Sequence, residues 1–407
     1  MTNQYDAIVV GARCAGSPTA MLLARQGYRV LVVDRASFPS DTVSTLVIHS
    51  TGLAALRRWG LLDEVLSTGC PPMGTYSLDF GPFVLAGTPR PHEGISMACA
   101  PRRTVLDKVL VDAAAHAGAE VRERFTVEDV VVEDGVVAGI RGHGEGGQSV
   151  VERARVVIGA DGHHSRVARA VEPEHYNEKP MLENAFYTYW SGLPVDCFET
   201  LIRDDRGIAA IPTNDGLTLV LVGFPVSQAS AFRQDVEGNY LGAIERAPEF
   251  ASRLAVATRE ERFIGGGVPN FFRKPFGPGW ALVGDAGYTK DPITAQGISD
   301  AFRDAEICAR AVDEALGGGR PYDDAMSEYQ RARDERALPI YEFTTQLATL
   351  EPPPHEMQRL LAAVSRRQEA MDDFVSVMAG TLSPVEFFDR ANIGRIMAAS
   401  GAPTPTG

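Results

Sequence analysis

The sequence predicts a mixed α/β and α+β fold in which a parallel-sheet domain is interrupted by an antiparallel sheet and followed by a helical region. An apolar run, a glycine-rich loop, a run of helix formers and a second apolar run follow one another over residues 5–33, which is the β-α-β order of a parallel sheet. Glycines and prolines punctuate short alternating segments over residues 71–100 and again over 173–275, which is typical of antiparallel hairpins.

Length and composition limit the class of protein. The 407 residues predict two or three domains. A net charge of -14 without a basic stripe argues against a nucleic-acid partner. No run approaches about 18 apolar residues, so we expect no transmembrane segment. The polar start, Met1 to Asp6, indicates no leader peptide.

The cysteines indicate a reduced, cytoplasmic environment and no metal site, because they are odd in number and lack CxxC or zinc-ligand spacing. They are Cys14, Cys70, Cys99, Cys197 and Cys308.

The first domain is predicted from residue 5 onward. Tyr5–Val10 and Arg29–Val33 are expected to be buried parallel strands around a helix over Pro18–Gln26. A second helix is expected after Ser50 as its N-cap, and a third from Arg103.

Further strands follow in the same domain and in the inserted sheet. We expect a hairpin of 127–132 and 136–140 turning at Asp134-Gly135. Buried strands are predicted at 156–158 and 280–283, and antiparallel strands at 186–190, 208–211 and 217–224.

The C-terminal part is predicted to be helical. A helix is expected from Ile298 to Leu316, and the region 321–400 continues in helices broken at Pro339, Pro352–Pro354 and Pro384. Residues 401–407 are expected to form a flexible tail.

The loop after the first strand has the features of a dinucleotide-binding turn. It reads Gly11-Ala12-Arg13-Cys14-Ala15-Gly16 and is followed, 23 positions after Gly11, by Asp34. Such a turn presents a helix N-terminus to a pyrophosphate, and the acidic residue accepts hydrogen bonds from ribose hydroxyls. Arg13 replaces the middle glycine, so its side chain either turns aside or offers its guanidinium to the phosphates.

Three later segments narrow the choice of dinucleotide cofactor that the first turn leaves open. They are Gly159 to Arg166 (GADGHHSR), Trp280 to Gly287 (WALVGDAG) with Asp291 to Ile298 (DPITAQGI), and Arg103 with Leu106 and Leu110. Together, and in their order along the chain, these segments resemble the group A flavoprotein monooxygenase and geranylgeranyl reductase superfamily, which has the para-hydroxybenzoate hydroxylase fold. The resemblance covers about residues 5–311 and is weak over the two interruptions.

The resemblance implies a discontinuous Rossmann-like FAD-binding domain made of residues 1–70, 101–172 and 276–320. Residues 71–100 and 173–275 would form a substrate-binding β-sheet domain. It implies FAD as cofactor, and NADPH or NADH as co-substrate. Asp285 of the Gly284-Asp285 pair would bind a ribityl hydroxyl, and the start of the following helix would stabilise the anionic reduced ring. The implied cofactor-binding residues are Gly11, Arg13, Ala15, Gly16, Asp34, Arg35, Arg103, Asp161, Gly284, Asp285, Pro292, Gln296, Gly297 and Ile298.

Several other residues have two interpretations. His49 could donate or relay a proton beside the flavin, although a capping or solvent-facing histidine is the commoner case. Lys290 is more often solvated on such a loop than functional. Tyr187 and Tyr189 share one face of a strand and either pack in the sheet or form the wall of an aromatic substrate pocket.

The sequence therefore predicts an FAD-dependent monooxygenase that uses NAD(P)H and oxygen to hydroxylate or epoxidise a lipophilic or aromatic small molecule through a flavin C4a-hydroperoxide. A flavin-dependent reductase of geranylgeranyl-type alkenes is the alternative. A halogenase is disfavoured because the Trp-x-Trp-x-Ile-Pro signature is absent. A non-catalytic flavin carrier or a nicotinamide-only dehydrogenase would also bind a dinucleotide. The oligomeric state is not predicted.

Overall fold

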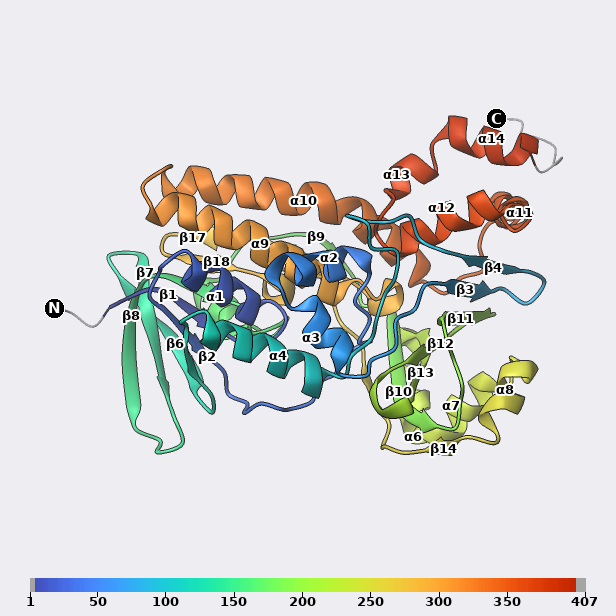
Figure 1. Ribbon diagram of the computed structural model, residues 1–407, viewed down its shortest axis with the longest axis horizontal. Coiled ribbons are helices and arrows are strands. Elements are labelled where there is room, and N and C mark those ends of the chain that lie inside the picture. The colour runs from blue at the N-terminus through green and yellow to red at the C-terminus, as the bar shows by residue number, and fades with distance from the viewer. Residues whose placement is uncertain (1–3, 400–407) are drawn as a thin grey trace.

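Five parallel strands form the centre of one of the two eight-stranded sheets. The computed structural model describes residues 4–399, and its elongated shape places this sheet at one end and the inserted sheet at the other (Figure 1). The strand order is β17-β18-β8-β1-β2-β5. Their bounds are β1 (Tyr5–Val10), β2 (Val30–Val33), β5 (Glu120–Arg122), β8 (Ser149–Gly159), β17 (Phe276–Gly277) and β18 (Trp280–Leu282).

The parallel register aligns the ends of four strands. Val10 pairs with Val33 and with Gly159, and Gly159 pairs with Leu282. The segments that follow these strands therefore leave the sheet at the same edge, which is where ligands bind in open α/β sheets. The sequence predicted the parallel strands because they are apolar and buried on both faces.

Helices cover this sheet and begin close to the predicted positions. The predicted helix after the glycine loop starts two residues earlier than expected, and His49 rather than Ser50 occupies the N-cap of the next one. The Ser50 hydroxyl is buried without a hydrogen-bond partner among the described residues. The helices are α1 (Gly16–Arg25), α2 (Ser50–Trp59), α3 (Leu62–Ser67), α4 (Arg103–His116), α5 (Arg166–Val171) and α9 (Gly297–Leu316).

The predicted hairpin branches from this sheet at β8. β6 (Thr126–Glu133) and β7 (Val136–His143) pair antiparallel, and β7 pairs with β8. Asp134 and Gly135 have φ of 50° and 79°, as a tight primed turn requires. The hairpin turn is therefore as the sequence predicted.

The inserted sheet has the order β14-β10-β13-β12-β11-β3-β4, with β15 also paired to β10. The three predicted strands are present and antiparallel, although β11 and β3 pair in parallel. The bounds are β3 (Tyr76–Asp79), β4 (Val84–Gly87), β10 (Glu183–Ser191), β11 (Phe198–Arg203), β12 (Arg206–Pro212), β13 (Thr218–Pro225), β14 (Thr258–Arg259) and β15 (Ile264–Gly266).

The sequence missed two features of the insertion. Three helices pack on the outer face of the sheet: α6 (Ala229–Gln234), α7 (Val236–Ile244) and α8 (Pro248–Leu254). A small separate sheet joins β9 (His175–Lys179), β16 (Asn270–Arg273) and β19 (Tyr288–Thr289). The insertion is thus a sheet covered by helices rather than one open sheet. Short 3₁₀ turns complete the fold: η1 (Asn214–Gly216), η2 (Val226–Gln228), η3 (Gly284–Ala286) and η4 (Pro292–Thr294).

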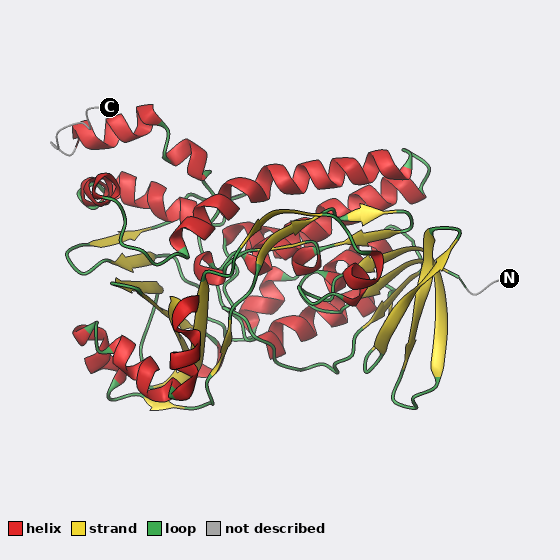
Figure 2. Ribbon diagram, turned by 180° about the vertical axis from the view of Figure 1, so that it is seen from behind, coloured by secondary structure: helices red, strands yellow, loops and turns green. Residues whose placement is uncertain are grey.

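The C-terminal region divides between the two sheets. α10 (Tyr322–Leu347) lies along α9, and the later helices lie over β3 and β4 (Figure 2). They are α11 (His355–Val364), α12 (Gln368–Met378), α13 (Pro384–Phe387) and α14 (Arg390–Ala399). The predicted break at Pro339 is wrong: α10 continues through it, because Ala337 and Tyr341 are fully buried on either side and hold the helix in place. The predicted tail at 401–407 lies outside the described residues. No helix within residues 4–399 is long and apolar enough to cross a membrane.

Substitution of Gly16 tests how tightly the glycine turn after β1 is packed. A Cβ at Gly16 would lie 1.8 Å from the backbone oxygen of Gly11. We expect Gly16→Ala to lower the free energy of unfolding of the apoprotein by about 1–3 kcal/mol. Gly242→Ala on α7 is the control, since a Cβ there meets nothing within 4 Å. Urea unfolding measures both, and equal midpoints for the two variants would contradict the steric argument.

Candidate functional site

The glycine turn after β1 is shaped by close backbone approach. Gly11 has a φ of 100°, and a Cβ there would lie 2.5 Å from the Ala160 oxygen. The backbone N–H groups of Arg13, Cys14 and Ala15 have no hydrogen-bond partner within residues 4–399, as at the start of any helix. These groups are available to an anion at the N-terminus of α1.

Asp34 lies beside this turn at the end of β2. Its carboxylate accepts hydrogen bonds from the backbone N–H of Ala12 (2.7 Å) and of Ala36 (2.8 Å). Each carboxylate oxygen keeps further acceptor capacity, so Asp34 can still accept from a ribose hydroxyl. Arg35 is exposed next to it.

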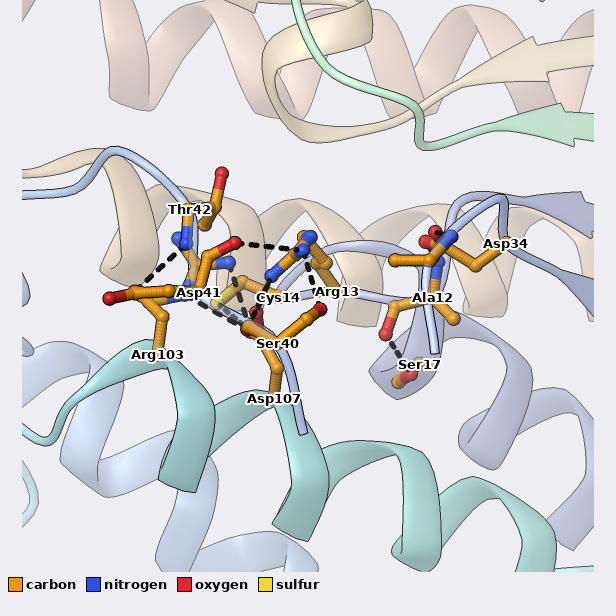
Figure 3. Close-up of polar contacts among 11 residues, drawn as sticks. Ala12, Arg13, Cys14, Ser17, Asp34, Ser40, Asp41, Thr42, Arg103 and Asp107 are labelled. Carbon is orange, nitrogen blue, oxygen red and sulfur yellow. Dashed lines mark hydrogen bonds and ion pairs between the residues drawn. The ribbon is translucent and has the colours of Figure 1, made fainter. Parts of the chain in front are cut away.

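Arg13 turns its side chain toward α4 and the 40–41 loop (Figure 3). Its guanidinium donates to the Asp107 carboxylate, to the Ser40 hydroxyl at 3.0 Å and to the Asp41 carbonyl at 3.3 Å. It also lies 5.3 Å from the centre of the Phe38 ring. Of the two arrangements that the sequence left open, the structure has the side chain turned aside.

Asp107 is a site residue that the sequence analysis missed. Its carboxylate is fully buried and accepts from Arg13, from Arg103 at 2.9 Å and from the Cys14 thiol at 3.5 Å. Two arginines thereby neutralise one buried carboxylate. The Arg103–Asp107 spacing of four residues, on one face of a helix, was the available signal.

The Gly284-Asp285 turn meets the first motif directly. Gly284 has a φ of 59°, and a Cβ there would lie 2.8 Å from the Ala15 Cβ. The Asp285 side chain is exposed and has no hydrogen-bond partner within residues 4–399. Lys290 and Arg103 both act on this carboxyl and favour its charged form. An acceptor is thus free beside the α1 N-terminus.

The segment before α9 exposes backbone on the same side. Ala295 has a φ of 52°, and α9 starts at Gly297, which is exposed with open space where a Cβ would lie. The Gln296 side-chain amide N–H donates to the Met378 carbonyl, so this side chain already has a partner within the protein. Pro292 is half-buried and Ile298 is buried, so backbone rather than side chains is available here.

Lys290 is buried rather than solvated. It forms an ion pair with Asp300, and Arg303 bonds to the other oxygen of that carboxylate. Burial would raise the pKa of Asp300, but Lys290 and Arg303 lower it to about 2. The commoner interpretation of Lys290 as a solvated loop residue is wrong, because α9 supplies a buried carboxylate within reach.

Asp161 follows β8 at the same sheet edge. One carboxylate oxygen accepts from the backbone N–H of Arg166 at 2.6 Å, and the other is buried without a partner among the described residues. Burial raises the pKa of Asp161. The free oxygen is an acceptor that the protein itself leaves unused.

His49 neither caps α2 with its side chain nor faces solvent. Its ring is fully buried, with Nε2 3.1 Å from the Thr294 carbonyl and Nδ1 2.7 Å from the Tyr76 hydroxyl. Since a carbonyl only accepts, Nε2 carries the proton and Nδ1 accepts from Tyr76. Burial lowers the pKa of His49 to about 4, so the ring is neutral near pH 7.

Tyr187 and Tyr189 are on one face of β10 and both are buried. Their rings meet edge to face at 6.0 Å, and the Tyr187 hydroxyl accepts from the backbone N–H of Ser44 at 3.3 Å. The Tyr189 hydroxyl is buried without a partner among the described residues, and the Arg102 guanidinium covers its ring at 4.3 Å. Their part in substrate binding stays a prediction.

These features fit a flavin dinucleotide. The free N–H groups at α1, the partnerless Asp285 carboxylate and the exposed backbone at Gly297 gather around the contact of Ala15 with Gly284. They have the chemistry that a pyrophosphate, a hydroxylated chain and a flavin ring require, in that order.

Comparison with known proteins decides the family. Residues 4–344 match the family described as FAD binding domain. The chain belongs to this family. It is an FAD-dependent oxidoreductase. A digeranylgeranylglycerophospholipid reductase 2 of Methanococcoides burtonii is 26% identical over 345 residues, which are 81% of this chain and 80% of that protein.

Several solved structures share the fold. The myxobacterial chondrochloren halogenase CndH covers 99% of this chain and 98% of its own, with a TM-score of 0.79 and 24% identity. A flavoprotein/dehydrogenase from Cytophaga hutchinsonii covers 98% and 100%, with a TM-score of 0.82 and 19% identity. PqsL, a probable FAD-dependent monooxygenase from Pseudomonas aeruginosa, covers 92% and 99%, with a TM-score of 0.71 and 21% identity.

Because the Arg13 side chain is turned to Asp107 and to the 40–41 loop, we expect Arg13→Gly to bind FAD. The loss of its bonds to Ser40 and Asp41 should speed hydrogen exchange over residues 39–42. Flavin absorbance of the purified variant and exchange by mass spectrometry measure the two effects. Complete loss of flavin would show instead that the guanidinium makes an essential contact with it.

His49 makes folding depend on pH. Its pKa is lower in the folded than in the unfolded chain, so its contribution to stability is full above pH 6.5 and is lost as the pH falls toward about 4. We expect urea unfolding to show a decrease of up to about 3 kcal/mol over this range. His49→Gln should reduce this decrease, whereas Gln at the exposed His355 should not. Identical pH profiles in all three proteins would contradict the assignment.

Proposed function

We propose that this FAD-dependent oxidoreductase is a monooxygenase that uses NADPH or NADH and oxygen to hydroxylate or epoxidise a lipophilic or aromatic small molecule. One observation carries the proposal: Tyr187 and Tyr189 of the inserted sheet belong to the same buried apolar cluster as Ala295, which lies two residues before the exposed Gly297 of the cofactor domain. An aromatic wall therefore adjoins the proposed cofactor site, as recognition of a lipophilic substrate requires.

Different residues of the proposed site would bind different parts of FAD. The α1 N-terminus with Gly11, Ala15 and Gly16 would hold the pyrophosphate, and Asp34 the adenosine ribose. Asp285, near Arg103, would hold the ribityl chain, and the 292–298 segment would hold the ring. When bound, FAD supplies hydride acceptance and oxygen activation.

The chain's own residues orient the reactants and exclude water. The N-terminus of the 20-residue helix α9 favours negative charge next to Gly297. Leu46, Val47 and Ala295 belong to the same apolar cluster as Tyr187, which keeps water from the proposed ring site. The neutral His49 donates its Nε2 proton to the Thr294 carbonyl and so fixes the turn before α9.

A second candidate is reduction of an isoprenoid alkene. The relative from Methanococcoides burtonii is by name a digeranylgeranylglycerophospholipid reductase, and its likeness extends over 81% of this chain. The same cofactor residues and the same apolar cluster would serve that reaction. The two candidates differ in their need for oxygen.

The test is turnover of the FAD-loaded protein with NADPH or NADH on a panel of phenols, other aromatics and isoprenoid alkenes, with and without oxygen. A monooxygenase inserts one atom from labelled oxygen into the product, which mass spectrometry detects. Addition of two hydrogens under strict anaerobiosis would overturn the proposal in favour of the reductase. A halogenated product in the presence of chloride or bromide would overturn it in favour of a halogenase.

A further inference from the structure

Two buried carboxyl groups join the inserted sheet to the segment before α9. Glu183, at the start of β10, is 3% exposed, and Asp291, the N-cap of η4, is 1% exposed. The two carboxyl groups lie within hydrogen-bonding reach of each other, and one oxygen of each is buried without a donor among the described residues. Because a carboxylate only accepts hydrogen bonds, this contact needs a proton on one of them.

The remaining contacts leave room for one shared proton. Asp291 Oδ1 accepts from the backbone N–H of Ile293 at 3.1 Å. The backbone N–H of Glu183 also acts on the Asp291 carboxyl, but Asp291 Oδ2 and Glu183 Oε2 are buried and have no hydrogen-bond partner among the described residues. One O–H between these two oxygens satisfies both of them, whereas two ionised groups would leave two buried charges in contact.

The surroundings of the pair carry no compensating cation. Lys290, the neighbour of Asp291 in the chain, is bonded to Asp300. Asn184 turns its amide N–H to the Met181 sulfur, and Asn270 accepts from the backbone of Asp291. Burial and the mutual charge raise the pKa of Glu183 well above its ordinary range, with no basic group opposing the shift.

The Glu183 carboxyl packs against Gly223 of β13, where the sheet has no side chain. A Cβ at Gly223 of β13 would lie 1.7 Å from Glu183 Oε1, so the carboxyl occupies the space above this glycine. Glu183 is therefore held between β13 and Asp291 rather than free to turn to solvent.

We propose that Glu183 and Asp291 share one proton, and that this acid–carboxylate pair fixes the 292–297 segment to β10, which makes Glu183 a positioning residue for the flavin site. The proposal rests on the proposed placement of the flavin ring at this segment. Glu183 is the donor and Asp291 the acceptor. The pair links the sheet proposed to bind substrate with the turn proposed to bind cofactor.

The link should weaken at alkaline pH. An acid whose pKa is raised by folding stabilises the fold below its unfolded pKa, and this contribution is lost as the pH rises through the folded value. Among the described residues no titratable group other than the pair itself acts on either carboxyl. Loss of the proton would place two anions in contact and loosen the turn before α9.

The experiment compares two variants of matched size in the full chain. Glu183→Gln keeps a donor for Asp291, and Glu183→Met fills the same space without one. We expect the dissociation constant for FAD to stay within about threefold of wild type in the Gln variant and to rise about tenfold or more in the Met variant. The flavin absorption spectrum should shift in the Met variant alone.

Infrared spectroscopy tests the proton itself, without the cofactor. At about pH 7, where exposed carboxyls are ionised, we expect a carboxylic-acid C=O band that Glu183→Gln removes. Glu249→Gln, at an exposed carboxyl on α8, should leave that band in place. Gly223→Ala should displace Glu183 and remove the band without changing either acid, which keeps the test available if a Glu183 variant fails to fold.

The outcomes separate the two proposals. An FAD-binding wild-type protein without the band overturns the shared proton alone. A band together with equal FAD affinity in the Gln and Met variants overturns the positioning role. A wild-type protein that binds no FAD overturns the proposed cofactor placement, and the positioning role with it. In that case the infrared band still shows whether Glu183 and Asp291 share a proton.

Discussion

The site depends on one constraint, the parallel register of β2, β1, β8 and β18. Because Val10 pairs with Val33 and Gly159, and Gly159 with Leu282, four segments far apart in the chain end at one edge of the sheet. Asp34, Gly11, Asp161 and Asp285 come from these four segments. The same geometry places the N-terminus of α1 against η3, where only glycine fits at position 284. The register of these strands therefore brings the acceptors and free N–H groups to one edge of the sheet.

Buried charge reinforces this frame on two sides. On α4, the Asp107 carboxylate accepts hydrogen bonds from Arg13 and Arg103. On the other side Asp300 gathers Lys290 and Arg303. Both carboxylates are buried and both are fully paired, which is the condition under which buried charge is tolerated. Arg103 of one cluster and Lys290 of the other both act on the Asp285 carboxyl.

The sequence predicted the regular parts of the molecule well. Apolar runs ending in glycine or aspartate located the parallel strands, and Asp134-Gly135 located a hairpin turn, since both signals are local. It failed where packing overrides local preference. Pro339 lies inside α10 because neighbouring residues bury the helix, and α6 to α8 were missed because they are short and their apolar residues are recognisable only against the sheet they cover.

What the sequence by itself determined was the chemistry of the cofactor loops, because a glycine turn and the acid that follows it are set by a few adjacent residues. What only the tertiary structure decided was the partner of each side chain. Arg13 turns to Asp107, His49 binds Thr294 and Tyr76, Lys290 is buried against Asp300, and Glu183 meets Asp291. Except for Lys290 and Asp300, each partner lies more than 25 positions away in the chain. Such contacts arise from the packing of helices and sheets and leave no local pattern in the sequence.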